Sequence, residues 1–308
     1  MRTPAKLGLF ALVLALVLGA GLAAGRFFDL GGHSTAGHGD SSHGDSRHGD
    51  ASSTTAHGDG DGHDAKPATA PAFPKGLLVS QDGYTLRPAT TILPAGRSTF
   101  SFTVLGPDNR PVREYTPTHD KDLHLILVRR DLSGFQHLHP TRDAAGTWSV
   151  PLDLVEPGTY RAFADFAPKA KGENALTLGV DLSVPGGYQP RPVPAPSRTA
   201  QVDGYTVTLD GQLKPGTSSP VTLTVARNGQ PVTDLQPYLG AYGHLVALRA
   251  GDLAYLHVHP DGAPADGTTA AGPAIRFFAE VPTAGTYRLF LDFRHQGVVR
   301  TAVFTATA

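Results

Sequence analysis

The second half of the chain repeats the first half in the same order, and this internal duplication limits the possible folds more than any other feature. The run HLILVRRDLSGFQHLHP at His124–Pro140 returns 120 positions later as HLVALRAGDLAYLHVHP at His244–Pro260. PGTYRAFADF at Pro157–Phe166 likewise matches AGTYRLFLDF at Ala284–Phe293. The shared order predicts two copies of one domain, each of about 105–115 residues.

Each copy has the pattern of an antiparallel β-sandwich. Short runs that alternate apolar and polar residues, such as Phe100–Val104 and Tyr160–Phe166, are separated by Gly, Pro, Asp and Asn. Several short strands without crossover helices predict an all-β fold with two tandem immunoglobulin-like sandwich repeats. A barrel and a jelly roll are the alternatives. Trp148, Tyr160 and Phe163 are expected in the core of the first copy.

Changes in composition divide the chain into five segments. The copies are separated by QPRPVPAPSRTA at Gln189–Ala200, whose prolines favour an extended, semi-rigid spacer. The predicted segments are a signal anchor or signal peptide (1–25), a disordered linker rich in His, Gly and Asp (26–75), the first sandwich repeat (76–188), the proline-rich linker (189–200) and the second sandwich repeat (201–308).

The first 25 residues predict export. Leu7–Ala24 contains no charged residue, and its 18 residues form a helix of about 27 Å, close to the thickness of the hydrocarbon layer. Arg2 and Lys6 before it favour a cytoplasmic N-terminus and an exported remainder. The length favours a retained membrane anchor, and secretion after cleavage before Arg26 is the alternative.

The predicted linker is rich in histidine and contains His-Gly-Asp four times. It has too few apolar residues to form a core. Imidazoles on a flexible chain can wrap around a metal ion, and a solvated spacer is the alternative. The candidate ligands here are His33, His38, His43, His48, His57 and His63.

The residue types that are missing restrict the metals that the chain can bind. The sequence has no cysteine, and its only methionine is Met1. Nitrogen and oxygen ligands suit Cu(II), Zn(II) or Ni(II) rather than Cu(I). The 26 basic and 27 acidic residues leave a net charge of −1, which gives no sign of the basic face of a nucleic-acid-binding protein.

Each copy also has three histidines at matching positions. Side chains at i and i+2 of a strand share one face, so His137 and His139 project together. Antiparallel pairing would bring His124 about 5 Å from one of them at Cα. Three such imidazoles suit Cu(II) or Zn(II), at about one ion per repeat, and a hydrogen-bonded structural role is the alternative. The candidate ligands are His124, His137 and His139 in the first copy and His244, His257 and His259 in the second.

Asp165 and Asp292 end matching strands and are further candidates. Each could ligate a metal directly or accept a hydrogen bond from a ligating histidine. The alternative for each is a salt bridge with the arginine four residues earlier, Arg161 or Arg288.

Two histidines occur in one copy only. His119 precedes the first of the three matched histidines in the first copy, and His295 follows the last matching run in the second. Each could complete the site of its own copy or be an ordinary surface residue.

The stretch DLHLILVRRDLSGFQHLHP at Asp122–Pro140, followed by GTWSVPLDLVEPGTYRAFADF at Gly146–Phe166, resembles a family of exported bacterial proteins that accompany copper and heavy-metal efflux systems. The resemblance covers most of the first copy and, more loosely, the second. The overall plan is also similar to the periplasmic copper-resistance sandwiches, although the chain lacks the Met and Cys ligands of their Cu(I) sites. The resemblance implies an exported location, the six matched histidines as ligands, and a metal efflux or uptake system as partner.

These features predict an exported, membrane-tethered protein that binds Cu(II) or Zn(II) and acts in metal buffering, delivery or resistance. The alternative is a tandem immunoglobulin-like interaction or pH-sensing module without bound metal. No enzymatic activity is predicted, because the sequence has no Gly-x-Ser-x-Gly motif and no phosphate loop. A metalloenzyme would need a general base, for which only Glu156 and Glu280 are candidates.

Overall fold

The computed structural model describes residues 73–172, 174–256 and 258–308, and the side chain of His259 is not described. The predicted anchor, the six linker histidines and His257 therefore lie outside the described residues. None of the helices in the described part of the chain is long and apolar enough to cross a membrane.

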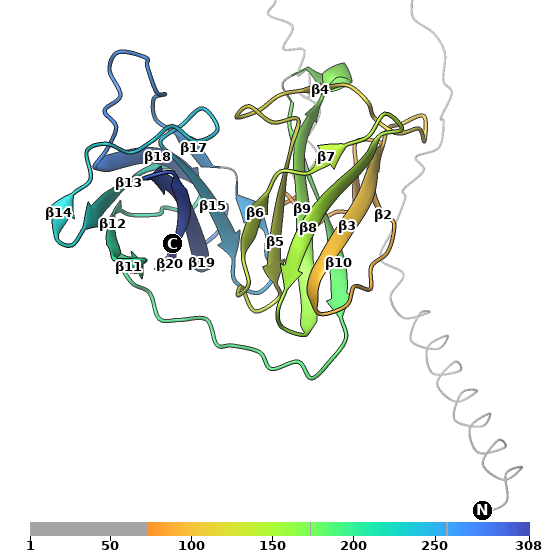
Figure 1. Ribbon diagram of the computed structural model, residues 1–308, viewed down its shortest axis with the longest axis horizontal. Coiled ribbons are helices and arrows are strands. Elements are labelled where there is room, and N and C mark those ends of the chain that lie inside the picture. Colours follow the sequence, from red (N-terminus) through yellow and green to blue (C-terminus); the bar gives the residue numbers. More distant parts are fainter. Residues whose placement is uncertain (1–72, 173, 257) are drawn as a thin grey trace, which may run out of the picture. The chain divides into compact units, whose positions relative to one another are not determined.

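The first repeat is a sandwich of two antiparallel sheets (Figure 1). One sheet has the order β1-β2-β3-β8-β7, and the other has the order β10-β9-β5-β6, with β4 paired to β9. The elements are β1 (Ser80–Gln81), β2 (Tyr84–Pro88), β3 (Gly96–Leu105), β4 (Tyr115–Thr116), β5 (Leu123–Arg129), β6 (Gln136–Leu138), β7 (Thr141–Arg142), β8 (Thr147–Leu154), β9 (Gly158–Pro168), the 3-10 helix η1 (Lys169–Lys171) and β10 (Leu176–Val184).

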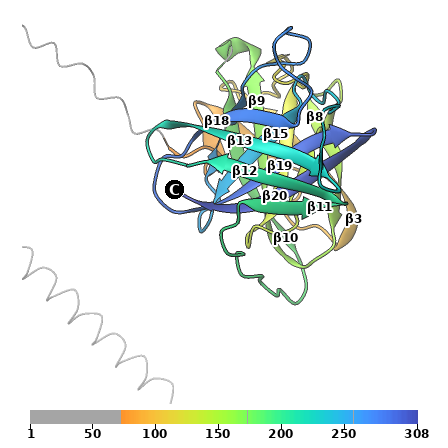
Figure 2. The ribbon, with the colours of Figure 1, turned by 90° about the vertical axis from the view of Figure 1, so that its left-hand side faces the viewer.

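The second repeat has the same two-sheet plan. Its sheets have the orders β11-β12-β13-β18-β17, with β14 paired to β13, and β16-β15-β19-β20. Figure 2 shows β11, β12, β13 and β18 of the first of these sheets side by side. The strands are β11 (Thr199–Val202), β12 (Tyr205–Gly211), β13 (Ser218–Arg227), β14 (Gln230–Pro231), β15 (Gly243–Arg249), β16 (Tyr255–Leu256), β17 (Val258–Pro260), β18 (Ala274–Glu280), β19 (Thr286–His295) and β20 (Val298–Thr307). The prediction of two tandem immunoglobulin-like sandwiches is confirmed.

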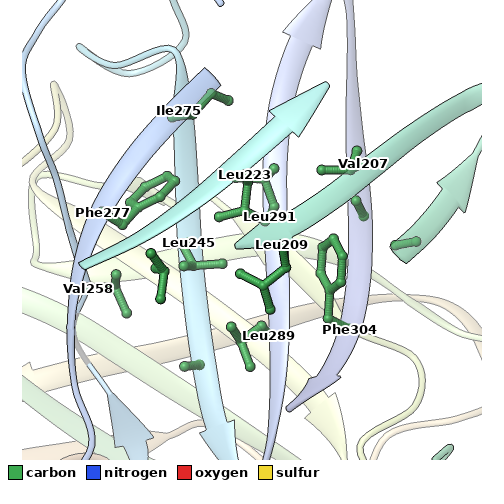
Figure 3. Close-up of a cluster of buried hydrophobic side chains, with 14 of the residues drawn as sticks. Val207, Leu209, Leu223, Leu245, Val258, Ile275, Phe277, Leu289, Leu291 and Phe304 are labelled. Atoms are coloured by element: carbon green, nitrogen blue, oxygen red, sulfur yellow. The ribbon is translucent and has the colours of Figure 1, made fainter. Parts of the chain in front are cut away.

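Each sandwich encloses its own apolar core. Buried and exposed residues alternate along β18, as expected for a strand with one face on the core and one in water. In the second repeat, side chains from both sheets meet between the layers, among them Leu223, Leu245, Leu289 and Phe304 (Figure 3). Trp148 and Tyr160 belong to the core of the first repeat, as predicted.

A third apolar cluster joins the two repeats, and it explains why β5 and β15 are apolar on both faces. Every residue of β5 is buried. One face of β5 lies on the core of its own repeat, while Ile126 and Val128 on the other face pack with residues of the second repeat such as Val246 and Leu248. Phe163 also lies in this cluster, so its predicted place in the core of the first repeat was wrong.

Candidate metal centre

Three imidazoles of the first repeat converge beside β5. His124 lies in β5, His137 lies in β6, and His139 follows β6 directly. The register pairs Ile126 with His137, and the ladder ends at the pair of Leu125 with Leu138. His124 and His139 are the next residues on the two segments, and their rings lie close together. The predicted approach of His124 to the His-x-His segment is confirmed.

The spacing of these rings suits the ligands of a single ion. The ring centroids are 5.4 Å apart for His124 and His137, 5.0 Å for His124 and His139, and 4.9 Å for His137 and His139. Their candidate ligand atoms all lie within 4.8 Å of one another. Imidazoles that share a tetrahedral zinc ion at about 2.0–2.1 Å have ring centroids about 5 Å apart.

Hydrogen bonds fix which nitrogen of two of these rings carries a proton. His124 Nε2 is 2.9 Å from the Thr118 carbonyl oxygen, which can only accept, so Nε2 is the N–H donor. His137 Nδ1 is 2.7 Å from Asp292 Oδ2, so Nδ1–H donates to this carboxylate. The nitrogens left over, His124 Nδ1 and His137 Nε2, are 3.1 Å apart. When both rings are neutral, these two nitrogens point lone pairs at each other.

Two facing lone pairs repel, so the arrangement requires positive charge between them. A metal ion bound to both nitrogens supplies it, and so does a proton on one of them. Adjacent nitrogen ligands of a tetrahedral zinc ion are about 3.3 Å apart, close to the separation found here. His139 Nε2 supplies a third nitrogen, which is buried and has no hydrogen-bond partner within the described part of the chain.

Burial keeps the His124 and His139 imidazoles neutral at physiological pH. The pKa of His124 falls to about 4, mainly because burial disfavours the charged ring, and the hydrogen bond to the Thr118 carbonyl opposes this shift only in part. Burial and then the neighbouring His137 and His124 lower the pKa of His139 to about 3. Neutral imidazole is the form that ligates metal.

His244 of the second repeat reproduces the arrangement of His124. Its Nε2 donates to the Tyr238 carbonyl oxygen at 2.8 Å, and burial lowers its pKa to about 4. The remaining two candidates of this repeat, His257 and the His259 side chain, lie outside the described residues. A second three-histidine site is therefore neither found nor contradicted.

The two candidate carboxylates lie buried beside these histidines. Asp292 is paired across the sheet with His244, but it accepts its hydrogen bonds from His137 of the other repeat and from Thr301 Oγ1 at 2.6 Å. Asp165 is paired with His124 and accepts from Thr177 Oγ1 at 3.1 Å and from Tyr255 Oη at 3.4 Å.

The alternative salt bridges with the arginines were wrong. Arg161 binds Asp181 at 3.0 Å and the carbonyl oxygens of Gly76 and Leu77, and Arg288 donates to Thr305 Oγ1 at 2.5 Å. Residues four apart on one strand are about 13 Å apart, so partners on the neighbouring strand are closer.

His119 lies close to the same histidines, in agreement with the first of its two predicted roles, and it also approaches His244 of the other repeat, which the sequence did not predict. Its ring centroid is 5.0 Å from that of His244 and 6.1 Å from that of His124. Proximity to His124 in sequence hinted at this, but the approach to the other repeat depends on the tertiary structure. His295 lies elsewhere, between Tyr205 Oη at 2.6 Å and Asp234 Oδ1 at 3.0 Å.

A cavity of about 340 Å³ lies beside the histidines. His119, His124 and His137 border it from the first repeat, and His244 and Tyr255 border it from the second. Ions and small ligands could therefore reach the imidazoles through this cavity.

The family model described as a domain of unknown function (DUF8832) matches residues 79–183 and again residues 200–308. No curated protein gives a significant match. The chain is similar to the Yersinia pseudotuberculosis adhesin InvE at 14% identity, with a TM-score of 0.23 and coverage of 74% of this chain and 60% of the adhesin. It is similar to invasin, a bacterial integrin-binding protein, at 13% identity and a TM-score of 0.22, with coverage of 74% of this chain and 40% of invasin. The chain thus spans about three fifths and two fifths of these proteins, and scores this low do not extend their functions to it.

Proposed function

We propose that this chain, which belongs to the DUF8832 family, binds one Cu(II) or Zn(II) ion through His124, His137 and His139. The observation that carries the proposal is the 3.1 Å approach of His124 Nδ1 and His137 Nε2, whose partner nitrogens already donate to a carbonyl and to a carboxylate. His139 Nε2, which has no hydrogen-bond partner among the described residues, completes a three-nitrogen ligand set.

The surroundings of the ligands favour a site that exchanges its ion. Asp292 accepts the Nδ1–H hydrogen bond of His137 and thereby orients its Nε2 toward His124, as carboxylates behind metal-bound histidines do. Three protein ligands leave a fourth position for water or a small ligand, as in open zinc sites. Since His124 and His137 border the cavity, that ligand can be replaced from solvent. Buffering or delivery of the ion requires such exchange.

The wider role that we propose follows from the sequence. An exported location places the chain where divalent ions arrive from outside the cell, and retention of residues 1–25 would tether it to the membrane. The six histidines of residues 33–63 would then collect ions, and a metal efflux or uptake system would be the partner.

A carrier agrees better with the surroundings of the site than an enzyme does. Glu156 pairs with Arg129 and Arg191, and Glu280 is exposed on β18. Neither glutamate borders the histidine cavity, where a metal-bound water would need its general base.

A second candidate function needs a proton in place of the metal. If His137 Nε2 carried a proton, its N–H would donate a hydrogen bond to His124 Nδ1. The His137 ring would then be an imidazolium, whose charge Asp292 would balance. The chain would then be a tandem immunoglobulin-like interaction or pH-sensing module, and the fold of the two repeats suits this role. A pH-dependent transition that persists in excess chelator would favour this function.

The deciding experiment measures metal binding in the full chain with the six histidines of residues 33–63 replaced by Gln, called here the tail-substituted chain. After dialysis against EDTA, the chain is titrated with ZnCl2 or CuSO4 in a calorimeter. His137→Asn keeps a donor for Asp292 but removes Nε2, and it should weaken binding by on the order of 100-fold, or about 2.7 kcal/mol.

His295→Gln is the matched control, because the side chain of His295 is about as buried as that of His137 and is also hydrogen-bonded, but it lies outside the histidine cluster. Its affinity should equal that of the tail-substituted chain. Absence of binding, or binding that His137→Asn leaves unchanged, would contradict the proposal.

A further inference from the structure

His119 and His244 form a pair between the repeats that the three-histidine site does not use. Their ring centroids are 5.0 Å apart with an interplanar angle of 84°. This separation lies within the 4.9–5.4 Å range of the three candidate ligands next to them. The two rings are therefore spaced as two ligands of one ion would be.

The hydrogen bond of His244 determines which of its two ring nitrogens carries the proton. Because Nε2–H donates to the Tyr238 carbonyl, Nδ1 of the neutral ring keeps its lone pair. Burial lowers the pKa of His244 to about 4, so this lone pair is free of protons at physiological pH. Both His244 and His119 border the cavity, which opens a path for an ion to this pair.

The position of His119 depends on a tight turn that both repeats share. The turn closes through a bridge between Thr118 and Lys121, and His119 has a φ of 48°. In the second repeat Tyr238 and Ala241 form the same bridge, and Leu239 occupies the matching position with a φ of 52°. Only the first repeat therefore presents an imidazole from this turn, and the pair is formed once.

The charges around the pair suit a second cation next to the first. His119 lies 6.1 Å from His124 between ring centroids, and His244 lies 6.1 Å from His137. Asp165 and Asp292 are both buried beside these rings, and their carboxylates would reduce the repulsion between two divalent ions.

We propose that His119 and His244 bind a second divalent ion, whose other ligands are water or small molecules from the cavity. The inference rests on the proposed function, since the pair would receive an ion at the cavity and pass it to His124, His137 and His139. The described residues supply two protein ligands here and three at the first site, so the pair fills second and empties first.

The test titrates the EDTA-dialysed tail-substituted chain with CuSO4 and records the number of bound ions together with the electron paramagnetic resonance spectrum. Two ions per chain are expected, and the half-field signal of two coupled Cu(II) ions should develop as the second ion binds. Asparagine tolerates the positive φ at position 119, so His119→Asn should fold. In this variant the stoichiometry should fall to one ion, and the half-field signal should disappear.

His244→Gln should give the same loss, because Gln can still donate to the Tyr238 carbonyl but has no Nδ1. His295→Gln should retain both ions and the half-field signal. Thermal unfolding of each variant shows whether it is folded, and agreement of the two variants separates ligand loss from damage to either site.

The outcomes separate this inference from the proposed function. One ion that is lost in His137→Asn and kept in His119→Asn overturns the second position and supports the first. Two coupled ions that persist in both His119→Asn and His244→Gln also overturn it. If the tail-substituted chain binds no copper, both proposals are overturned.

Discussion

The strand pairing around the His-x-His-Pro element differs between the two repeats. In the first repeat, β6 carries His137 and pairs with β5, beside His124. In the described part of the second repeat, Tyr255 and Leu256 pair with β15, and the strand from Val258 to Pro260 pairs with β18 of the other sheet. Leu138 and its counterpart Val258 are thus held by different strand neighbours, β5 and β18.

The difference extends to the carboxylates. The matched pairs of His124 with Asp165 and of His244 with Asp292 are kept in register. However, His137 of the first repeat donates to Asp292 of the second. The candidate site therefore depends on both repeats, whereas the sequence predicted one independent site in each. Duplication gave each repeat matching histidines and a matching aspartate. The contact between the repeats then placed the histidine of one beside the aspartate of the other.

The largest expected effect comes from breaking the contact between the repeats. Phe290 stacks on Phe135 with ring centroids 4.0 Å apart, within the apolar cluster that joins the repeats. Phe290→Ala should lower the free energy of unfolding by about 3–5 kcal/mol, because a buried ring is lost and a cavity remains. Urea denaturation measures the change, and the exposed Val298→Ala should change it by less than about 0.5 kcal/mol. A small effect for Phe290→Ala would show that the repeats do not stabilise each other.

The next effect distinguishes the two carboxylates. Asp292→Asn weakens the hold on His137 and should lower the affinity for Zn(II) in the tail-substituted chain by about 10–100-fold. Asp165→Asn is the matched change in the first repeat, where the carboxylate accepts hydrogen bonds from Thr177 and Tyr255. It should lower the affinity less. Calorimetry decides, and equal effects would contradict a site that depends on one cross-repeat hydrogen bond.

A smaller effect concerns pH and should be the same in both repeats. The folded-state pKa values of His124 and His244 are both about 4, below the usual value of about 6.5. As pH falls through this interval, the unfolded chain takes up protons that the folded chain refuses. The free energy of unfolding should therefore fall by up to about 1.4 kcal/mol per pH unit for each histidine.

Urea denaturation between pH 7 and 4.5 in the presence of EDTA measures this slope. His124→Gln and His244→Gln should each reduce the slope by a similar amount, because each variant removes one titrating group and keeps the donor to a backbone carbonyl. A slope that neither variant changes would show that the burial of these two rings does not control the pH dependence.

The smallest effect tests the turn that differs between the repeats. His119→Leu places in the first repeat the residue that the second repeat has at the matching position, Leu239, with nearly the same φ. The free energy of unfolding should change by less than about 0.5 kcal/mol, as measured by thermal denaturation. A loss of several kcal/mol would indicate that His119 stabilises the fold rather than binding an ion.

Much of the fold was predictable because it depends on local pattern. The alternation in runs such as Phe100–Val104, the turn residues between them and the internal repeat were sufficient for two tandem sandwiches. The same pattern could not show that Phe163 faces the other repeat, because alternation separates the two faces of a strand but does not say what covers each face.

The sequence by itself determined the residue types and their spacing: two matched sets of three histidines, each on a β-rich repeat, with no sulfur ligand beyond Met1. The tertiary structure decided which of these groups meet. The contacts of His137 with Asp292 and of His119 with His244 join residues 155 and 125 positions apart. Such contacts follow from the packing of β5 and β9 against β15 and β19, where apolar surfaces from both repeats are removed from water. The hydrophobic effect is not directional. An apolar pattern in the sequence therefore shows that a strand face will be buried, but not which other segment will cover it.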